Sequence, residues 1–134
     1  MIEQTLSIIK PDAVERNLEE KIKSFFQSKK LKIVKSKKVQ ITKEEAAEFY
    51  KVHQTKPFYE KLCNYLSSGP IVVMILEGDE SISKNREYMG ATDPAKAKEG
   101  TLRKMHGISI DKNSIHGSDS PENAKIEIAF FFNK

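Results

Sequence analysis

Apolar residues recur along the chain with two different spacings, which predict strands interleaved with helices. The run 71–76 is apolar throughout and is bounded by Gly69-Pro70 and Glu77-Gly78, so it predicts a fully buried central strand. Shorter apolar stretches predict strands over 5–9 and 31–41, and a last strand over 108–110 and Ile115. Four strands are therefore expected.

Helical spacing and clear start signals predict the helices between these strands. Thr42 precedes Glu45 by three residues, which is the pattern of a capping box. Helices are predicted from Pro11, over 18–28, from Thr42 through Tyr50 and Val52, from Phe58 to Leu66, from Ser81 past Arg86, around Leu102-Arg103, and over 121–132. This order predicts one domain over residues 1–134, an α/β two-layer sandwich of the ferredoxin-like class.

Composition places the chain among soluble globular proteins. Its 134 residues suffice for one domain with its own core, and they are 38% hydrophobic and 31% charged. No apolar run reaches the length of about 18 residues that a membrane span needs. The start lacks the pattern of a secretory signal, and Cys63 is the single cysteine, expected as a buried thiol. We therefore expect a cytoplasmic protein.

The net charge of +4 permits anionic partners such as nucleotides, nucleic acid or phosphorylated metabolites, without choosing among them. Lysines cluster over 21–43, where a solvated helix end and a charged strand edge explain them. Lysine on an edge strand also discourages pairing with the edge of another sheet.

The segment 113–120, Asn-Ser-Ile-His-Gly-Ser-Asp-Ser, carries the most distinctive candidate chemistry. It sets the imidazole of His116 beside a glycine, hydroxyls and a carboxylate, just before a predicted helix start. A histidine is largely neutral near pH 7, so such a ring can act as a nucleophile. Gly117 would let backbone and substrate approach closely. An ordinary polar turn with an incidental histidine has the same composition, so both interpretations stay open here.

Several separated residues suit an anionic ligand that carries a ring. Lys10 follows a predicted strand, and Arg86 and Arg103 offer planar forks that match phosphate oxygens. Thr92 could donate a hydroxyl to phosphate, and Phe58 could stack on a base. Surface arginines, a capped turn and a core phenylalanine are the alternative explanations.

Other standard motifs are absent from the sequence. There is no glycine-rich loop that ends in Gly-Lys-Ser/Thr, no dinucleotide-binding pattern and no nucleophile elbow of a serine hydrolase. His53, His106 and His116 lack the spacing of metal ligands and have no cysteine partners.

Taken together, the motifs resemble the nucleoside diphosphate kinase family, in order from Thr5 to Phe132. They are Lys10-Pro11-Asp12, Lys56-Pro57-Phe58, Met89-Gly90-Ala91-Thr92, Gly100-Thr101-Leu102-Arg103 and the segment 113–120. The resemblance implies a ferredoxin-like fold with a four-stranded antiparallel sheet covered by helices. It also implies ping-pong exchange of the terminal phosphoryl group between nucleoside triphosphates and diphosphates.

The resemblance also implies roles for individual residues. His116 matches the nucleophile phosphorylated on Nδ1, Glu127 the carboxylate that orients the other ring nitrogen, and Ser118 the hydroxyl that steadies this carboxylate. Residues that match the phosphate and ribose contacts are Lys10, Tyr50, Arg86, Thr92, Arg103 and Asn113. Phe58 matches the stacking aromatic, with Leu62 and Ile110 lining the same cleft.

For ligands and assembly, the resemblance implies Mg²⁺ held mainly through nucleotide phosphates, with no dedicated protein metal site. It further implies a homo-oligomer, a tetramer or a hexamer, with no membrane contact and no dedicated nucleic-acid site. Departures from the family pattern lie away from the cleft: Lys30 stands where many members carry glycine, and Glu99 replaces a common proline.

Two other hypotheses fit parts of the sequence. An RNA-recognition domain shares the fold class and a basic charge, but it needs an aromatic-rich strand that no predicted strand supplies. A catalytically silent relative is the second alternative, and intact His116, Lys10 and Glu127 speak against it.

Overall fold

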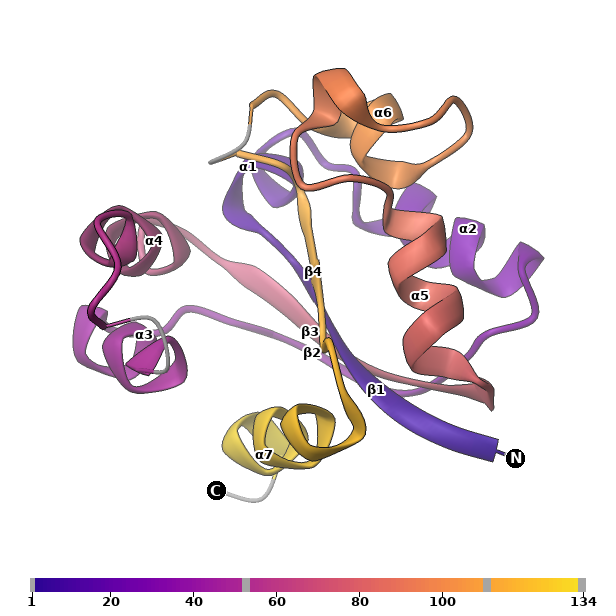
Figure 1. Cartoon of the computed structure of the whole chain (residues 1–134), viewed down its shortest axis with the longest axis horizontal. Coiled ribbons are helices and arrows are strands. Elements are labelled where there is room, and N and C mark those ends of the chain that lie inside the picture. Colours follow the sequence, from indigo (N-terminus) through magenta and orange to yellow (C-terminus); the bar gives the residue numbers. More distant parts are fainter. Residues whose placement is uncertain (1, 52–53, 110–111, 133–134) are drawn as a thin grey trace.

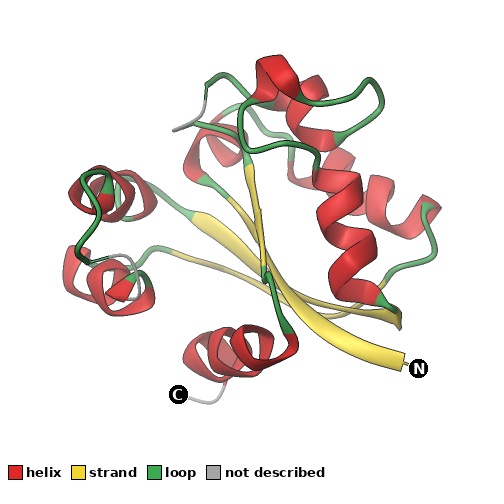
Figure 2. Cartoon of the chain, viewed as in Figure 1, coloured by secondary structure: helices red, strands yellow, loops and turns green. Residues whose placement is uncertain are grey.

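The computed structural model describes residues 2–51, 54–109 and 112–132. Its four strands form one antiparallel sheet in the order β2-β3-β1-β4 (Figures 1 and 2). The strands are β1 (Ile2–Ile9), β2 (Lys32–Val39), β3 (Ile71–Asp79) and β4 (Ile115–Gly117). The helices are α1 (Pro11–Glu15), α2 (Glu19–Ser28), α3 (Lys43–Phe49), α4 (Tyr59–Leu66), α5 (Ser81–Met89), α6 (Leu102–His106) and α7 (Pro121–Phe132), with a 3₁₀ turn at Pro94–Lys96.

β3 is the central strand that its apolar run predicted. It pairs with β1 on one side and with β2 on the other, and residues 71–76 are all buried. Successive side chains of a strand point to opposite faces, so Val72 and Met74 enter one hydrophobic cluster while Ile71 and Val73 enter another. The sheet therefore has a core on each face.

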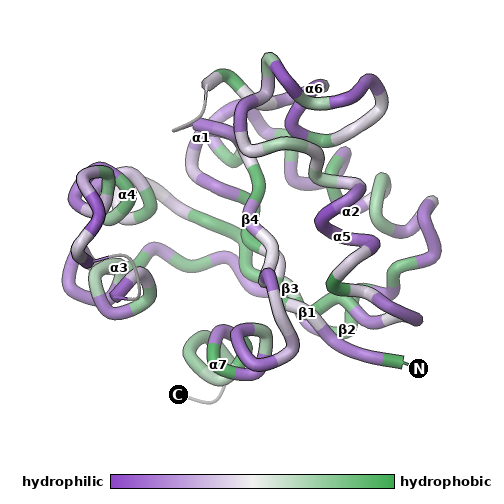
Figure 3. The backbone as a smooth tube through the Cα atoms, viewed as in Figure 1, coloured by the Kyte–Doolittle hydropathy of each residue, from purple (hydrophilic) through white to green (hydrophobic). Residues whose placement is uncertain are grey.

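Helices cover both of these faces (Figure 1). α1, α2, α5 and α6 contribute to the first cluster, while α3, α4 and α7 contribute to the second. Along the helices the backbone alternates between hydrophilic and hydrophobic segments, as expected for elements with one buried side (Figure 3). The predicted ferredoxin-like class and four-stranded antiparallel sheet are confirmed. The predicted two layers correspond to the sheet and the helices on one of its faces. The helices on the other face add a third layer.

Local signals fixed several helix boundaries as predicted. The Thr42 hydroxyl accepts from the Glu45 backbone N–H at 3.1 Å, and the Glu45 carboxylate accepts from the Thr42 N–H at 3.0 Å. α3 then ends at Phe49, and the predicted end at Val52 lies outside the described residues. Pro11 occupies the first turn of α1, where its missing N–H costs nothing.

The last strand is shorter than the sequence predicted, and the prediction of strand at 108–109 is wrong. Ile108 and Ser109 donate their backbone N–H groups to the Lys112 carbonyl, at 2.8 and 3.3 Å. Both N–H groups thus bond to Lys112 and not to a neighbouring strand, and β4 pairs with β1 over 115–117. Ile110 lies outside the described residues.

The edge strand and the thiol follow their predictions. β2 is at one edge of the sheet, and its lysines are exposed. Cys63 is buried in the second cluster. Within the described ranges, no helix has the length and apolar character needed to cross a membrane.

Candidate active site

The imidazole of His116 projects from the short edge strand β4, which pairs with β1 through the register Ile8↔His116. Its Nε2 lies 2.9 Å from Oε1 of Glu127, which belongs to α7. Ser118 donates its hydroxyl to the same carboxylate oxygen at 2.8 Å. The structure therefore brings together the three residues that the sequence singled out as nucleophile, orienting carboxylate and steadying hydroxyl.

Backbone hydrogen bonds hold this group in place. Ser118 donates its N–H to the Leu6 carbonyl of β1 at 3.1 Å, and the Leu6 N–H donates to the Ser118 hydroxyl at 3.3 Å. Glu127 lies about two turns into α7, which packs on β1, so the helix delivers its carboxylate to the end of β4. Sequence spacing alone could not establish that reach, because it depends on how α7 packs.

This arrangement distinguishes the two ring nitrogens of His116. A neutral imidazole whose Nε2–H donates to a carboxylate carries its free lone pair on Nδ1. The His116 side chain is 20% exposed, so the ring is held without being sealed from solvent. The ring of Phe49 meets it edge to face, with centroids 5.5 Å apart.

Gly117 is needed for a different approach from the one that the sequence suggested. A Cβ at this position would overlap the amide of Asn85 and lie 2.9 Å from Cε of Met89, both on α5. The glycine therefore lets α5 pack closely on β4. Close approach of a substrate at this glycine stays a prediction. The same helix carries Arg86, so this packing helps to bring that cation toward the site.

Lys10 and Asn113 form a polar pair beside β4. Lys10 is buried, and its ammonium donates to Oδ1 of Asn113 at 3.0 Å. The Asn113 amide donates to the backbone carbonyl of Thr92 at 3.2 Å. These contacts gather three residues that are far apart in the sequence.

Arg103 is anchored by the backbone on either side of the site. Its Nη1 donates to the Gly90 carbonyl at 3.1 Å and its Nη2 to the Ile115 carbonyl at 2.9 Å. Burial, together with the positive charge of Arg86, lowers the pKa of Arg103 to about 10. The guanidinium is still cationic near neutrality, but at a cost in desolvation and repulsion that an anionic ligand would relieve.

Arg86 is exposed on α5. Its charge acts on Arg103, and it also helps the Asn123 side-chain amide to lower the pKa of Asp119. Arg103 is therefore not a surface arginine, since it is buried and its pKa is lowered in part by the charge of Arg86.

A second group of candidates lies on α3 and α4. Phe58 precedes α4 with 42% of its surface exposed, so it is not a core phenylalanine. Leu62 follows one turn later, half-buried against the second cluster. Tyr50 is buried after α3; burial, aided by the charge of Glu127, raises its pKa and keeps the phenol protonated. Ile110 lies outside the described residues, so its predicted place in the cleft stays a prediction.

Sequence reasoning missed several residues that organise the site. The sequence predicts no role for Arg16, Asn85 or Ser114, and it marks Asp12 only as part of the Lys10-Pro11-Asp12 motif. Arg16 carried a weak signal, as an arginine in a lysine-rich half of the chain. Asn85 carried none, because its contact with Gly117 arises from the packing of α5 on β4.

The donor set bears on metal binding. In the described parts of the chain, no group of three or more histidine, cysteine, aspartate or glutamate side chains is placed to hold a metal ion. The site instead offers cations and hydroxyls, which are partners for an anion.

Comparison with known proteins supplies the remaining evidence. The family model "Nucleoside diphosphate kinase" matches residues 3–134. A nucleoside diphosphate kinase from Persephonella marina is 56% identical over 99% of this chain and 95% of its own length. The corresponding protein from Campylobacter fetus is also 56% identical, over 99% and 97%.

Solved structures agree with these sequence matches. The Aquifex aeolicus nucleoside diphosphate kinase superposes with a TM-score of 0.96 at 41% identity, covering 98% of this chain and 96% of that one. The apo enzyme from Encephalitozoon cuniculi gives a TM-score of 0.94 at 36% identity, over 98% and 90%.

Proposed function

Because the chain belongs to the nucleoside diphosphate kinase family, we propose that His116 carries a phosphoryl group from nucleoside triphosphates to nucleoside diphosphates. The observation that carries this proposal is the 2.9 Å contact between His116 Nε2 and Glu127. It leaves Nδ1 as the nucleophile and gives the ring a carboxylate partner for the positive charge that grows during attack.

The reaction has two matched halves. In the first, Nδ1 attacks the γ-phosphorus, the bond to the bridging oxygen breaks, and a nucleoside diphosphate leaves. In the second, a terminal phosphate oxygen of another diphosphate attacks the same phosphorus, and the imidazole is restored. The phosphorus–nitrogen bond is labile enough to pass the group on, whereas a serine phosphate would trap it.

The cationic side chains match what this transfer demands. Phosphoryl transfer depends mainly on in-line positioning and on neutralising charge spread over oxygens. Lys10, Arg86 and Arg103 supply that neutralisation, with Asn113 and Thr92 placing further polar atoms beside them. The buried charge of Arg103 is a preorganised donor of the kind that contributes most in a site shielded from water.

Mg²⁺ is the proposed cofactor, brought in on the nucleotide phosphates. The site's cations and hydroxyls suit an ion that the phosphates themselves bind, since no carboxylate cluster in the described residues competes for it. When bound, the ion would neutralise phosphate charge. The contribution of the chain is to hold those phosphates near His116 through Lys10, Arg86 and Arg103.

The base is proposed to stack on the exposed ring of Phe58, with Leu62 beside it and Tyr50 at the end of α3 toward the ribose. A stacking contact reads any base by its π-face, which predicts broad acceptance of purines and pyrimidines.

A homo-oligomer, either a tetramer or a hexamer, is proposed with this function, and so is a cytoplasmic location. The RNA-recognition alternative loses support, because helices cover both faces of the sheet that it would use.

The test is labelling with [γ-³²P]ATP and Mg²⁺. The protein should take up label that is labile in acid and stable in alkali, and unlabelled diphosphate should remove it as the matching triphosphate. His116→Ala should take up none while still binding nucleotide by calorimetry, and His106→Gln, the matched histidine control, should label normally. Label that persists on His116→Ala would overturn the proposal.

A further inference from the structure

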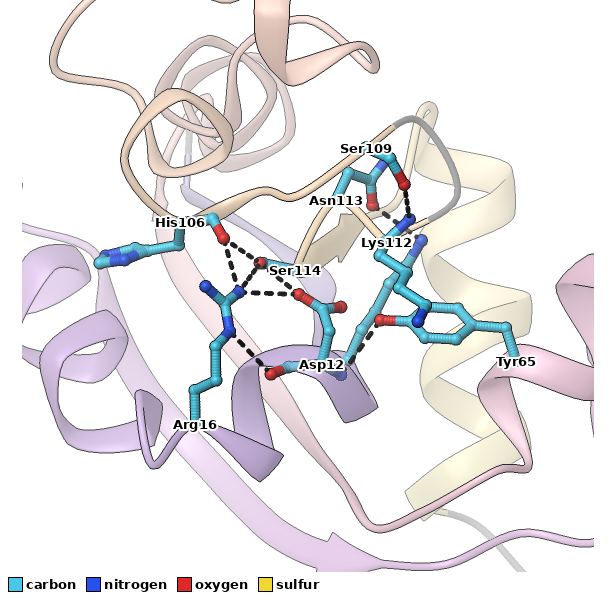
Figure 4. A network of polar contacts seen from close by, with 9 residues as sticks. Asp12, Arg16, Tyr65, His106, Ser109, Lys112, Asn113 and Ser114 are labelled. Carbon is cyan, nitrogen blue, oxygen red and sulfur yellow. Dashed lines mark hydrogen bonds and ion pairs between the residues drawn. The ribbon is translucent and has the colours of Figure 1, made fainter.

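The phosphate-facing candidates come from three separate segments that meet behind the site. Lys10 precedes α1, Arg103 lies in α6, and Asn113 follows the turn after α6. A polar network joins these segments (Figure 4). Its members are Asp12, Arg16 and Ser114, none of which is proposed to touch the nucleotide.

Ser114 is the centre of this network. Its φ of 75° lies in the left-handed region, which costs a non-glycine residue about 1 kcal/mol. The residue is buried, its carbonyl accepts from the Lys10 N–H at 2.9 Å, and its hydroxyl donates to Oδ2 of Asp12 at 2.6 Å. Hydrogen bonds from two directions therefore fix a bend that the backbone alone disfavours.

That bend determines where Asn113 points. Asn113 immediately precedes Ser114, accepts from the Lys10 ammonium at 3.0 Å and donates to the Thr92 carbonyl. If Ser114 relaxed from the left-handed region, the chain direction at Asn113 would change. The pair with Lys10 would then loosen, although neither residue had been altered.

Arg16 closes the network. Its Nε donates to the Asp12 carbonyl, and its Nη2 donates to Asp12 Oδ2, to the Ser114 hydroxyl and to the carbonyl of His106 at the end of α6 (Figure 4). One guanidinium thus ties α1 and the bend to the helix that carries Arg103.

Arg16 also offsets an unfavourable charge. The Asp12 side chain is 4% exposed and lies two residues from Lys10, so an unpaired carboxylate there would weaken the attraction for phosphate. The Arg16 Nη2 lies 3.0 Å from it and neutralises that charge.

We propose that Asp12, Arg16 and Ser114 act as positioning residues that hold Lys10, Asn113 and Arg103 in place for phosphoryl transfer from a nucleoside triphosphate. This inference rests on the proposed function. It adds a role for residues that are outside the reacting groups and assigns to the Ser114 hydroxyl the task of holding a left-handed bend.

The first test compares two donors with Ser114→Ala, which removes only the hydroxyl. ATP needs the positioned cations, whereas phosphoramidate presents a single phosphoryl group to the imidazole. Loss of a charge-assisted hydrogen bond should slow phosphorylation of His116 by ATP about tenfold. Phosphoramidate should react within about twofold of the parent rate, since only general accessibility of the ring is required. Ser28→Ala, which removes a hydroxyl that donates to the carbonyl of Phe25 at an exposed helix end, should leave both rates unchanged.

The second test is a double-mutant cycle with Asn113→Ala. If Ser114 acts through Asn113, removing the Ser114 hydroxyl should slow the ATP reaction by less than about threefold when Asn113 is already alanine.

Arg16→Lys serves if Ser114→Ala proves too unstable to assay. It keeps the positive charge but loses the planar guanidinium fork, so it should slow the reaction with ATP and not the reaction with phosphoramidate.

The outcomes separate the inference from the proposed function. Absence of label on His116 in the parent protein would refute the function itself. Three results with a normally labelled parent would refute only the positioning role. They are equal slowing for both donors, full additivity in the double-mutant cycle, and no slowing in either variant.

Discussion

Replacing Glu127 by glutamine would keep the shape of the side chain beside His116 and remove only its charge. The amide oxygen can still accept from Nε2 and from the Ser118 hydroxyl, which now lie 2.9 and 2.8 Å from the carboxylate. As Nδ1 attacks phosphorus, positive charge develops on the ring and the Nε2–H becomes a stronger donor. A carboxylate stabilises that state more than a neutral amide does.

The magnitude follows from the difference between the two kinds of hydrogen bond. A bond to a charged group contributes about 1.5–3 kcal/mol and a neutral one about 0.5–1.5 kcal/mol. The Glu127 side chain is 18% exposed, so solvent screens little of this difference. A loss of about 1.4 kcal/mol predicts about tenfold slower phosphorylation of His116 in Glu127→Gln.

Quench-flow with [γ-³²P]ATP is the appropriate assay, because the chain has no tryptophan to report the step by fluorescence. Glu122→Gln is the matched control: it is exposed in the first turn of the same helix and should react at the parent rate. Melting temperatures should show that both variants are folded. A parent-like rate in folded Glu127→Gln would refute the reasoning, since the carboxylate charge would then contribute nothing to attack.

Three other changes test the site and the fold. In steady-state assays, Arg103→Ala should lower kcat by about 100-fold or more. Lys35→Ala, on the exposed edge strand β2, should change kcat by less than about twofold. Equal losses would contradict the division between site charge and surface charge. Burial, with nearby cations acting in the same direction, lowers the pKa of His106, so the unfolded chain takes up this proton at higher pH than the folded chain. The free energy of unfolding should therefore fall as the pH drops through the usual histidine range, about 6.5. His106→Gln should flatten that part of a profile of melting temperature against pH. An unchanged profile in the variant would show that another group causes the loss. Lys30 has a φ of 64° just after α2, so Lys30→Gly should raise the free energy of unfolding in urea by about 0.5 kcal/mol, and a decrease would show that the backbone is unstrained there.

Most helix starts and the buried central strand could be predicted from the sequence. The capping box at Thr42, the helix start at Pro11 and the buried run of β3 each depend on neighbours a few residues apart, so short-range pattern predicted them. The strand predicted at Ile108 was wrong because an apolar residue can also lie in exposed, irregular backbone. Only the partner of its backbone N–H decides between a strand and irregular structure.

The chemistry of the site was determined in part by sequence alone. The residue types in 113–120, with Lys10, Arg86 and Arg103, permitted an anionic ligand and a nucleophilic histidine, because those capacities belong to the side chains themselves, and the resemblance to the family chose among the alternatives. The resemblance implied Nδ1 as the nucleophile, and the contact that leaves Nδ1 free for this proposed role depends on the packing of α7, which brings Glu127 to Nε2.

Tertiary structure alone revealed the support behind the site. Gly117 proved to make room for α5, and Ser114 is held left-handed by Asp12 and Arg16, residues about a hundred positions away in the chain. Composition and spacing determine what each side chain can do. Which groups meet is decided by contacts between distant segments, and those contacts exist only when the sheet and both helical layers pack together.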